Sequence, residues 1–434
     1  MKIREWIESN RNSIVELTSD LIRYDTVNRV TEGTEKESQL YLASVLSGEM
    51  GLQVDVFSPE AVEGFKEHPA YYPGKDYSER PNFVARWAGT GGGRSLLFSS
   101  HMDTAPVAPG WQRDPWTPVC EDGRLYGLGS FDMKGGLAAS VMAVRCLREL
   151  GYRPQGDVLI ESVVDEEFGG ANGTVACRAR GYEADAAIIP EPSNLAVCPA
   201  TRGGALWRAT FRGDAGMSFS GERIRNPAYA SGAFISYLEL FEKQRSGKPG
   251  PLPWYSHDGE LPVIVTRVAA GDMKPAFNDS GPTECYVDLW VECHPGTTEE
   301  MLRQELLGGF KSYLQERGLE HHDLPAVERL IRFLPGAEVA SDLPIIGLLA
   351  EETERATGRP ALVQGAPFAC DAFVFNVHSR TPAIVLGPPG GNAHAPEEFV
   401  DIQGLCELVE IYARAIVRWC GAEIPERSEG DEVE

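Results

Sequence analysis

The chain has 434 residues, of which 42% are hydrophobic and 24% charged, and a formal net charge of −24. This length exceeds what one hydrophobic core usually covers, so we expect two domains, or one domain with a large insertion. The negative charge argues against a nucleic-acid partner, and the absence of a membrane-length apolar run, or of a signal core behind MKIREWIESN, predicts a cytoplasmic protein without membrane contact.

The first two hundred residues alternate between helical and strand-like segments. Residues 3–22 have helical periodicity, Thr34 and Glu37 form a capping box that opens a second helix, and a third helix covers about 134–150. Strand-like runs occur at 52–57, 82–87, 94–100, 157–164 and 185–190. This alternation predicts an α/β domain with a largely parallel sheet and helices on both faces.

The pattern changes between about 203 and 335. Strands are predicted there at 206–211, 262–269, 284–292 and 326–333, and helices at 228–243 and 298–316. Two helices on a four-stranded, largely antiparallel sheet form a self-contained α+β unit. The α/β pattern then resumes with a helix near 343–357, a strand at 382–387 and a final helix ending near Trp419. We therefore predict a domain of residues 1–202 and 336–434, interrupted by an inserted domain of residues 203–335.

The nine cysteines occur singly, in odd number and without a CxxC pair. This argues against both a disulfide framework and a thiolate zinc site. Any metal bound by this chain must therefore use histidine and carboxylate ligands.

Ligands of an open α/β sheet bind outside the carboxyl ends of its strands, so polar residues that directly follow apolar runs are the first candidates. In LLFSSHMDT, His101 and Asp103 lie on the same side of an extended segment. Asp103 can therefore support a metal-binding imidazole from behind. The alternative is a surface-loop histidine beside an aspartate.

A second cluster is YGLGSFDMKGG, in which glycines surround Asp132 just before a helix. Because glycine has no Cβ, the backbone here can come close to the group that the Asp132 carboxylate binds. A phosphate cradle is the alternative, but the spacing matches neither the Walker motif nor GxGxxG, and an aspartate at its centre would repel phosphate. We therefore interpret Asp132 as a cation ligand.

The third cluster, VVDEEFGG, places Asp165, Glu166 and Glu167 after an apolar strand. A solvated acidic turn is the ordinary interpretation of such a run. Neighbouring glutamates point in different directions, however, so one can bind a metal while the other reaches a metal-bound water. The second glutamate then serves as general base and later gives the proton to the leaving amine.

Two further strand-end residues complete the set: Glu191 in AAIIPEPS and His394 in GPPGGNAHAPEEFV. Taken alone, a single glutamate or histidine at such a position more often has a structural role than a functional one. Together with the other clusters they supply two histidines and three carboxylates without cysteine, which suits two divalent cations roughly 3.5–4 Å apart. Zinc fits this mixture of nitrogen and oxygen ligands, and cobalt or manganese would also fit.

These residues resemble the M20 metallopeptidase and deacylase family over nearly the whole chain. The matching motifs, in order, are HMD at 101–103, GLGSFDMKGG at 127–136, DEEFGG at 165–170, EPS at 191–193 and AHAPEE at 393–398. The resemblance implies that Asp132 bridges the cations, that His101 and Glu191 bind one of them, and that Glu167 and His394 bind the other.

The same resemblance makes Glu166 the general base and Asp103 the residue that orients His101. It implies a catalytic domain of the zinc-peptidase type, with an inserted lid domain through which members often form homodimers. The position of Glu191 is usually Glu in the deacylases and carboxypeptidases of the family and Asp in its aminopeptidase-like and dipeptidase members. In this respect the chain resembles the deacylases. The implied substrate is a small molecule, an N-acyl amino acid or another amide that carries a carboxylate, and a dipeptidase or carboxypeptidase activity is the alternative.

Two positions depart from the family pattern. Met217 stands where lids commonly carry a histidine that stabilises the oxyanion, and a thioether cannot donate a hydrogen bond. Glu292 stands where the lid often carries an arginine. Residues that could take over a substrate-binding role are His257, Asn278 and Arg202. Because of these two departures, a second hypothesis is that this chain is a homologue that binds a metal or ligand without hydrolysing it.

Overall fold

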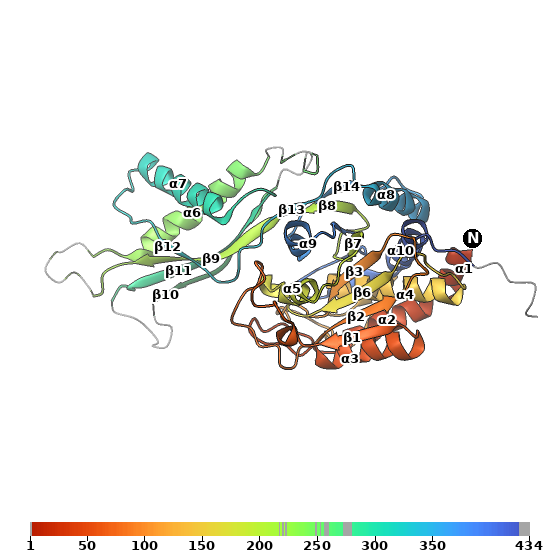
Figure 1. The fold of residues 1–434 in the computed structure, drawn as a ribbon. Helices are drawn as coiled ribbons and strands as arrows, with labels where there is room; N and C mark the ends of the chain where they lie inside the picture. Colours follow the sequence, from red (N-terminus) through yellow and green to blue (C-terminus); the bar gives the residue numbers. More distant parts are fainter. Residues whose placement is uncertain are drawn as a thin grey trace, which may run out of the picture. The chain divides into compact units, whose positions relative to one another are not determined.

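The computed structural model describes residues 2–216, 218, 221, 224–247, 250–251, 253–255, 260–271 and 280–424. The chain forms two compact units (Figure 1). Unit 1 comprises Met1–Ala200, Glu338–Ala366 and Cys370–Glu434, and unit 2 comprises Thr201–Ala337 and Pro367–Ala369. The inserted domain predicted from sequence, residues 203–335, lies inside the Thr201–Ala337 part of unit 2, and Pro367–Ala369 fall outside the predicted insertion.

The larger sheet has nine strands in the order β1-β2-β6-β3-β7-β15-β8-β13, with β14 paired to β8. These strands are β1 Gln53–Phe57, β2 Asn82–Trp87, β3 Leu96–His101, β6 Val158–Val163, β7 Ala186–Ile189, β8 Val197–Thr201, β13 Ala337–Glu338, β14 Val363–Ala366 and β15 Ala383–Val385. The adjacent strands β6, β3, β7 and β15 are parallel. The pairs β1–β2, β2–β6 and β8–β15 are antiparallel. The parallel centre confirms the predicted sheet and brings several strand ends to one edge.

Helices cover both faces of this sheet. Phe98 on β3 packs against Tyr412 of α10 (Ile402–Cys420), with 4.9 Å between the ring centroids. Phe98 is paired in register with Ile160, so the next residue along β6, Glu161, points to the opposite face. There Glu161 binds Arg178 of α5 (Asn172–Ala179). This agrees with the prediction of helices on both sides.

The remaining helices of unit 1 are α1 Lys2–Ser9, α2 Arg11–Ile22, α3 Lys36–Ser44, α4 Gly135–Glu149, α8 Pro344–Thr357 and α9 Ala372–His378. The periodic segment 3–22 is divided at Asn10, whose side-chain amide donates to the Trp6 carbonyl. The predicted capping box was wrong. Helix α3 begins at Lys36 without a side-chain cap, because the Thr34 hydroxyl donates to the Asp25 carbonyl instead.

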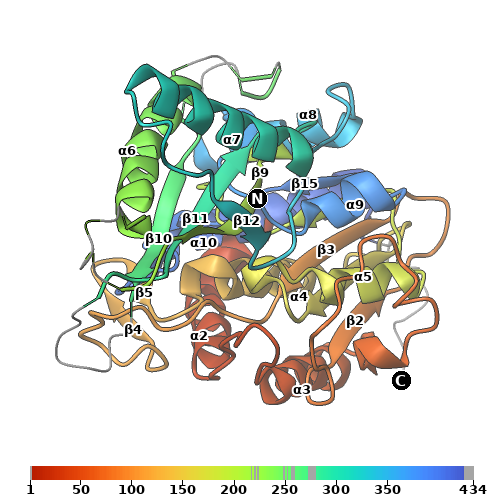
Figure 2. The same ribbon diagram turned by 90° about the vertical axis from the view of Figure 1, so that its left-hand side faces the viewer.

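Unit 2 contains the predicted α+β arrangement. Its sheet has the order β10-β11-β9-β12, all antiparallel, and α6 and α7 pack on it (Figure 2). The elements are β9 Gly203–Arg212, α6 Pro227–Arg245, β10 Val263–Ala270, β11 Glu284–Cys293, α7 Glu299–Glu316 and β12 Ala326–Arg329. Alternate residues Trp207, Ala209 and Phe211 of β9 are buried in the core of this unit, as period-two burial requires.

A third, four-stranded sheet was not predicted. It has the order β16-β17-β5-β4 and is made of β4 Val119–Glu121, β5 Arg124–Tyr126, β16 Gly390–Gly391 and β17 Phe399–Asp401. Strand β17 pairs with β5, so this sheet joins two segments that lie far apart in the sequence.

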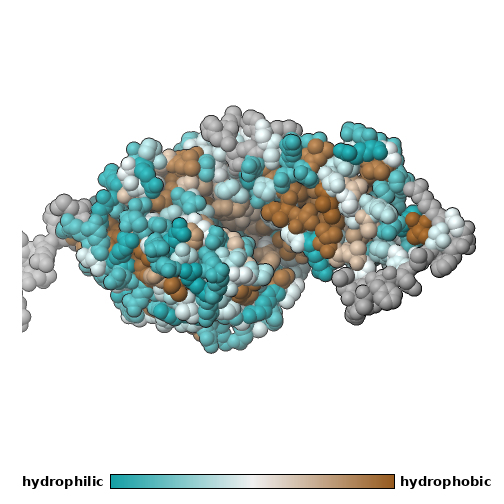
Figure 3. All heavy atoms as spheres, turned by 180° about the vertical axis from the view of Figure 1, so that it is seen from behind, coloured by the Kyte–Doolittle hydropathy of each residue, from teal (hydrophilic) through white to brown (hydrophobic). Residues whose placement is uncertain are grey.

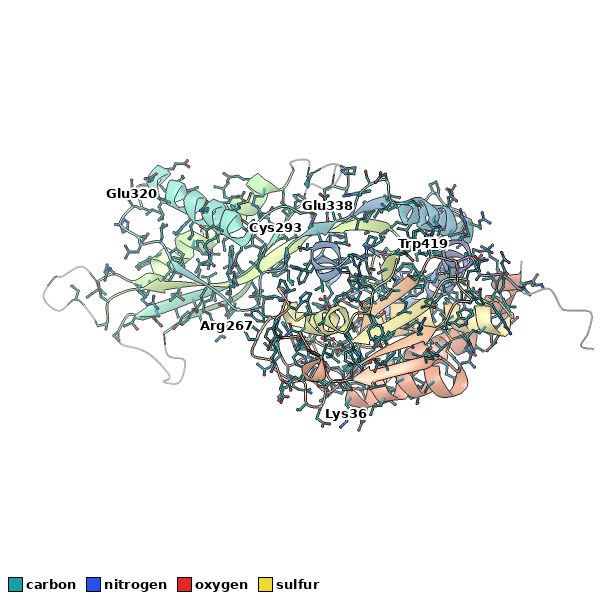
Figure 4. All side chains as sticks on the ribbon, in the orientation of Figure 1. Lys36, Arg267, Cys293, Glu320, Glu338 and Trp419 are labelled. Atoms are coloured by element: carbon teal, nitrogen blue, oxygen red, sulfur yellow. The ribbon has the colours of Figure 1, made fainter. Side chains whose placement is uncertain are left out.

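The cysteines, the surface and the longest helices can be compared with what the composition suggests. All nine cysteines are free, in keeping with the argument against a disulfide framework, and eight of them are buried. Hydrophilic residues cover much of the face in Figure 3, with hydrophobic residues grouped between them. Trp419, labelled in Figure 4, is the second-last residue of α10 and donates its indole N–H to the Ser95 carbonyl. Among the described helices we find none with the length and apolarity that crossing a bilayer requires.

Candidate metal centre

Three adjacent parallel strands of unit 1 end in candidate ligands. His101 is the last residue of β3, Glu166 and Glu167 follow β6, and Glu191 follows β7. The strands β3 and β6 are buried along their whole length, which fixes where their ends lie. Because β3 lies between β6 and β7, the three ends meet at one edge of the sheet.

The other two candidate ligands come from loops. Asp132 lies in the segment Ser130–Lys134, which precedes α4, and His394 lies between β16 and β17. The pairing of β17 with β5 brings the two loops together. Gly136 permits a close approach of α4 to the Glu191 loop, since a Cβ there would stand only 2.2 Å from the Pro190 carbonyl oxygen.

Asp132 directs one carboxylate oxygen to each histidine. The distance from its Oδ1 to His101 Nε2 is 3.3 Å, and that from its Oδ2 to His394 Nε2 is also 3.3 Å. His101 Nε2 is 3.5 Å from Glu191 Oε1, and His394 Nε2 is 3.1 Å from Glu167 Oε2. Four tetrahedral ligands of zinc, each about 2.0–2.1 Å from the ion, stand roughly 3.3–3.4 Å from one another. The observed spacing therefore suits two cations that share Asp132.

Glu166 lies beside this set at a longer distance. Its Oε2 is 4.0 Å from His101 Nε2, and His101, Glu166 and Glu191 form one of two groups close enough to hold an ion. The other group is Asp132, Glu167 and His394. The separation of 4.0 Å exceeds the spacing of tetrahedral ligands, so the Glu166 carboxylate is better placed to reach a molecule held by the ion than the ion itself.

The charges of the centre also fit cations. None of the carboxylates of Asp132, Glu166, Glu167 and Glu191 forms an ion pair with a lysine or arginine of the described residues. Glu167 Oε1 is buried and accepts no hydrogen bond from them. Gathering four buried or half-buried carboxylates without lysine or arginine is costly, and divalent cations would supply the missing positive charge.

The pKa values follow from this excess of negative charge. Burial opposes protonation of His101, but Glu191 and Asp132 outweigh it and raise the pKa of the imidazole well above its ordinary value. Glu167 does the same for the pKa of His394. Burial and repulsion by Asp132 raise the pKa of Glu191 to about 8. Burial also raises the pKa of Glu166, against the attraction of His101.

Asp103 makes contacts that differ from those expected. The group that accepts from His101 Nδ1 is the backbone carbonyl of Asp103, at 2.8 Å, whereas its carboxylate oxygen lies 3.8 Å from that nitrogen. The carboxylate instead accepts the backbone N–H groups of Glu166, at 3.0 Å, and Glu167, at 3.1 Å, together with the side-chain amide of Asn28 at 2.8 Å. Asp103 thus holds the loop that carries the two glutamates.

The predicted substrate-binding residues are less well described. Arg202, in unit 2, is buried and pairs with Glu292 at 2.8 Å. The guanidinium is thereby neutralised by the very residue that departs from the family pattern. His257, Asn278 and Met217 lie outside the described residues.

Two buried residues that touch the ligand loops were not assigned a role from sequence. Glu398 accepts backbone N–H groups of the Asp132 loop, and Asn28 binds Asp103. Glu398 lies four residues after His394 within AHAPEE, so an acid near a candidate ligand was the available signal. Asn28 follows α2 in a segment with no pattern that singles it out.

Comparison with known proteins gives a consistent result. The family model of Peptidase family M20/M25/M40 matches residues 97–418. The chain is 27% identical to N-formyl-4-amino-5-aminomethyl-2-methylpyrimidine deformylase of Bacillus subtilis (strain 168), over 96% of this chain and 97% of the relative. It is 25% identical to succinyl-diaminopimelate desuccinylase 2 of Ruegeria sp. (strain TM1040), over 94% and 95%.

Solved structures share the fold. Human carnosine dipeptidase 1 matches with a TM-score of 0.72 at 14% identity, over 97% of this chain and 98% of that chain. The match extends over both units, so the combination of a mostly parallel sheet and a separate four-stranded antiparallel sheet occurs in that protein as well.

Proposed function

We propose, because this chain belongs to peptidase family M20/M25/M40, that it is a dinuclear metal-dependent deacylase that cleaves the amide bond of a small N-acyl substrate. As a member of this family the chain is a hydrolase of amide bonds. The observation that carries the proposal is the position of Asp132, which directs one oxygen to His101 and the other to His394.

The ligand assignment follows from the distances. His101, Asp132 and Glu191 would hold one cation, and Asp132, Glu167 and His394 the other. When bound, the two cations polarise the carbonyl oxygen of the amide and lower the pKa of the attacking water. Zinc suits this set of nitrogen and oxygen donors, and cobalt or manganese are the alternatives.

Glu166 moves the proton in this proposal. It takes the proton from the water whose oxygen attacks the carbonyl carbon, and returns it to the nitrogen as the C–N bond breaks, giving a carboxylic acid and an amine. Two observations support this role. Asp103 holds the backbone N–H of Glu166, and burial raises the pKa of the Glu166 carboxyl, which makes its carboxylate a stronger base.

Two substrate classes are worth testing. The first is an N-acyl amino acid or related amide with a carboxylate, as the desuccinylase relative suggests. The second is an N-formyl aminomethyl heteroaromatic, as the deformylase relative suggests.

The metal requirement can be tested directly. Removing metal with a chelator is expected to abolish hydrolysis, and two equivalents of zinc or cobalt per chain are expected to restore it. Full activity in protein shown by elemental analysis to be free of metal would overturn the proposal.

A substrate panel tests the rest. It comprises N-formyl, N-acetyl and N-succinyl amino acids, an N-formyl aminomethylpyrimidine and simple dipeptides, each with the zinc-loaded enzyme. We expect a short-chain acyl amide to be cleaved fastest. Preference for a dipeptide would favour a peptidase, and no turnover by protein that holds two equivalents of zinc would favour a homologue that only binds.

A further inference from the structure

Glu398 is a buried residue whose carboxyl group accepts three backbone N–H groups of the loop that carries Asp132. Its Oε1 accepts the backbone N–H groups of Phe131, at 2.8 Å, and Asp132, at 2.9 Å, and its Oε2 accepts the N–H of Gly129 at 2.8 Å. Only 1% of the residue is exposed. Three backbone N–H groups that point at one side chain form a directional contact.

The loop needs such an acceptor because its backbone is irregular. Gly129 is in the left-handed region, with φ of 79°, and Asp132 has φ of −120° and ψ of 95°, far from helical values. The N–H groups of Gly129, Phe131 and Asp132 therefore lack the carbonyl partners that a regular helix would provide. Glu398 supplies the acceptors and so determines the conformation of this loop.

The same device occurs a second time in the centre. Asp103 accepts the backbone N–H groups of Glu166 and Glu167 with its carboxylate. Asp103 lies two residues after His101, and Glu398 lies four residues after His394. Each histidine segment thus brings an acid that holds the loop carrying other candidate ligands.

We propose that Glu398 is a positioning residue, which aims the Asp132 carboxylate between the two histidines by holding the backbone of residues 129–132. The inference rests on the proposed function, since it assigns Asp132 as the shared ligand. Glu398 touches no cation and no substrate in this role. The small sheet supports it, because β17 follows Glu398 directly and pairs with β5, while the Glu398 carbonyl accepts the N–H of Gly127.

The test compares two isosteric variants in adjacent positions. Glu398→Gln keeps one acceptor oxygen for Phe131 and Asp132 but turns an NH₂ group toward the N–H of Gly129, which breaks that contact. Glu397→Gln is the matched control. Glu397 also accepts two backbone N–H groups, those of Gln112 and Arg113, and binds the Arg113 guanidinium, but it holds a loop without candidate ligands.

Cobalt(II) titration of the metal-free full chain, followed by visible absorption, gives a readout that is independent of activity. We expect Glu398→Gln to bind cobalt about 10- to 100-fold more weakly in at least one site, with an altered absorption spectrum, as for other residues that orient metal ligands. Glu397→Gln is expected to match the wild type in affinity and spectrum. In steady-state assays Glu398→Gln should lower kcat more than it raises KM.

The outcomes separate the two proposals. A wild-type chain that binds no cobalt contradicts the dinuclear centre itself. If the wild type binds two equivalents and Glu398→Gln has the same affinities and spectrum, or if Glu397→Gln shows an equal loss, the role of Glu398 is overturned. Circular dichroism checks the fold of each variant. Should Glu398→Gln not fold, Glu398→Asp, which keeps the charge but shortens the reach, is subject to the same two outcomes.

Discussion

Carboxylates of unit 2 and carboxylates of the candidate metal centre in unit 1 meet different partners. In unit 2 they pair with arginine: Asp288 binds Arg208 through two hydrogen bonds of 2.7 and 2.8 Å, and Glu292 binds Arg202. In the candidate metal centre of unit 1, four carboxylates gather around two histidines, and none of them pairs with a lysine or arginine of the described residues.

The difference separates structural charge from functional charge. A carboxylate that pairs with arginine is neutralised within the fold, and breaking the pair leaves a charge without compensation. In a group of carboxylates without such partners, the negative charges repel one another until a cation binds or a proton is taken up. Neutralising one carboxylate should therefore have opposite effects on the stability of the metal-free protein in the two places.

The largest expected effect is on catalysis. Replacing Glu166 by glutamine removes the proposed general base, so kcat on the best substrate of the panel should fall by roughly 100- to 10,000-fold. The shape of the residue is kept, and Glu166 lies farther from His101 than the ligands do. Zinc content measured by elemental analysis should therefore stay at two equivalents.

The result can contradict the assignment in two ways. A Glu166→Gln variant with more than a tenth of the wild-type kcat would show that another group moves the proton. A variant that loses zinc would mean that Glu166 is a ligand, in keeping with its grouping with His101 and Glu191.

The next effect concerns a structural pair. Asp288→Asn in unit 2 should lower the free energy of unfolding by about 1–3 kcal/mol, because hydrogen bonds to charged groups are worth that much and Arg208 loses its charged partner. Urea denaturation of the full chain, with zinc and without it, measures the change. The loss should be the same in both conditions, and a loss seen only with zinc would contradict a purely structural role.

Sequence patterns predicted the parts of the centre that depend on local structure. His101, Glu166, Glu167 and Glu191 follow apolar runs, and a buried parallel strand leaves little freedom in where its end lies. The two units were predicted for a similar reason, since alternating and helical periodicities report which face of each element is buried.

Long-range contacts were harder to predict. The small sheet that brings the His394 loop to the Asp132 loop consists of strands of two or three residues, too short to show a period. The Asp103 carboxylate was expected to support His101, but it binds backbone N–H groups, which no sequence pattern reveals. The partner of Glu292 depends on how β11 lies beside β9, and this register is likewise a property of the folded sheet.

A smaller effect, of opposite sign to that of Asp288→Asn, is expected at Glu191. Burial and Asp132 raise the pKa of Glu191 to about 8, above its ordinary value of 4.5. The ionised form therefore costs folding free energy as the pH rises through this interval, and at pH 9 the cost is fully present. Glu191→Gln avoids it, so the metal-free variant should be more stable than the metal-free wild type at pH 9 by at least about 1 kcal/mol, the equivalent of less than one pKa unit.

Thermal unfolding at pH 9, with chelator and then with zinc, measures this prediction. With zinc the wild type should instead be the more stable protein. It would keep His101, Asp132 and Glu191 for one cation, whereas the variant lacks the charged ligand Glu191. If metal-free Glu191→Gln were less stable than the wild type, the carboxylate would be balanced within the fold, and the contrast between the two units would fail at this residue.

The smallest expected effect concerns an arginine-paired carboxylate of unit 2, and it is seen in how the stability of the protein depends on pH. Glu299, the first residue of α7, accepts hydrogen bonds from Trp207 and the Arg329 guanidinium. Burial acts to raise the pKa of Glu299, but these bonds and the charges of Arg329 and Arg303 outweigh it and lower the pKa below 4.5. A lowered folded pKa gives stability that is present above about pH 4.5 and is lost as the pH falls through the folded value.

Glu299→Gln should therefore be less stable than the wild type by about 0.5–1 kcal/mol at pH 7, a modest figure because Arg329 is half exposed. The deficit should shrink as the pH falls below about 4.5, where the wild-type carboxylate begins to take up a proton. Urea midpoints of both proteins between pH 7 and pH 4 measure it. A deficit that grew on acidification would mean that Glu299 favours its protonated form in the fold, as Glu191 does, and the arginines of unit 2 would then not balance its charge.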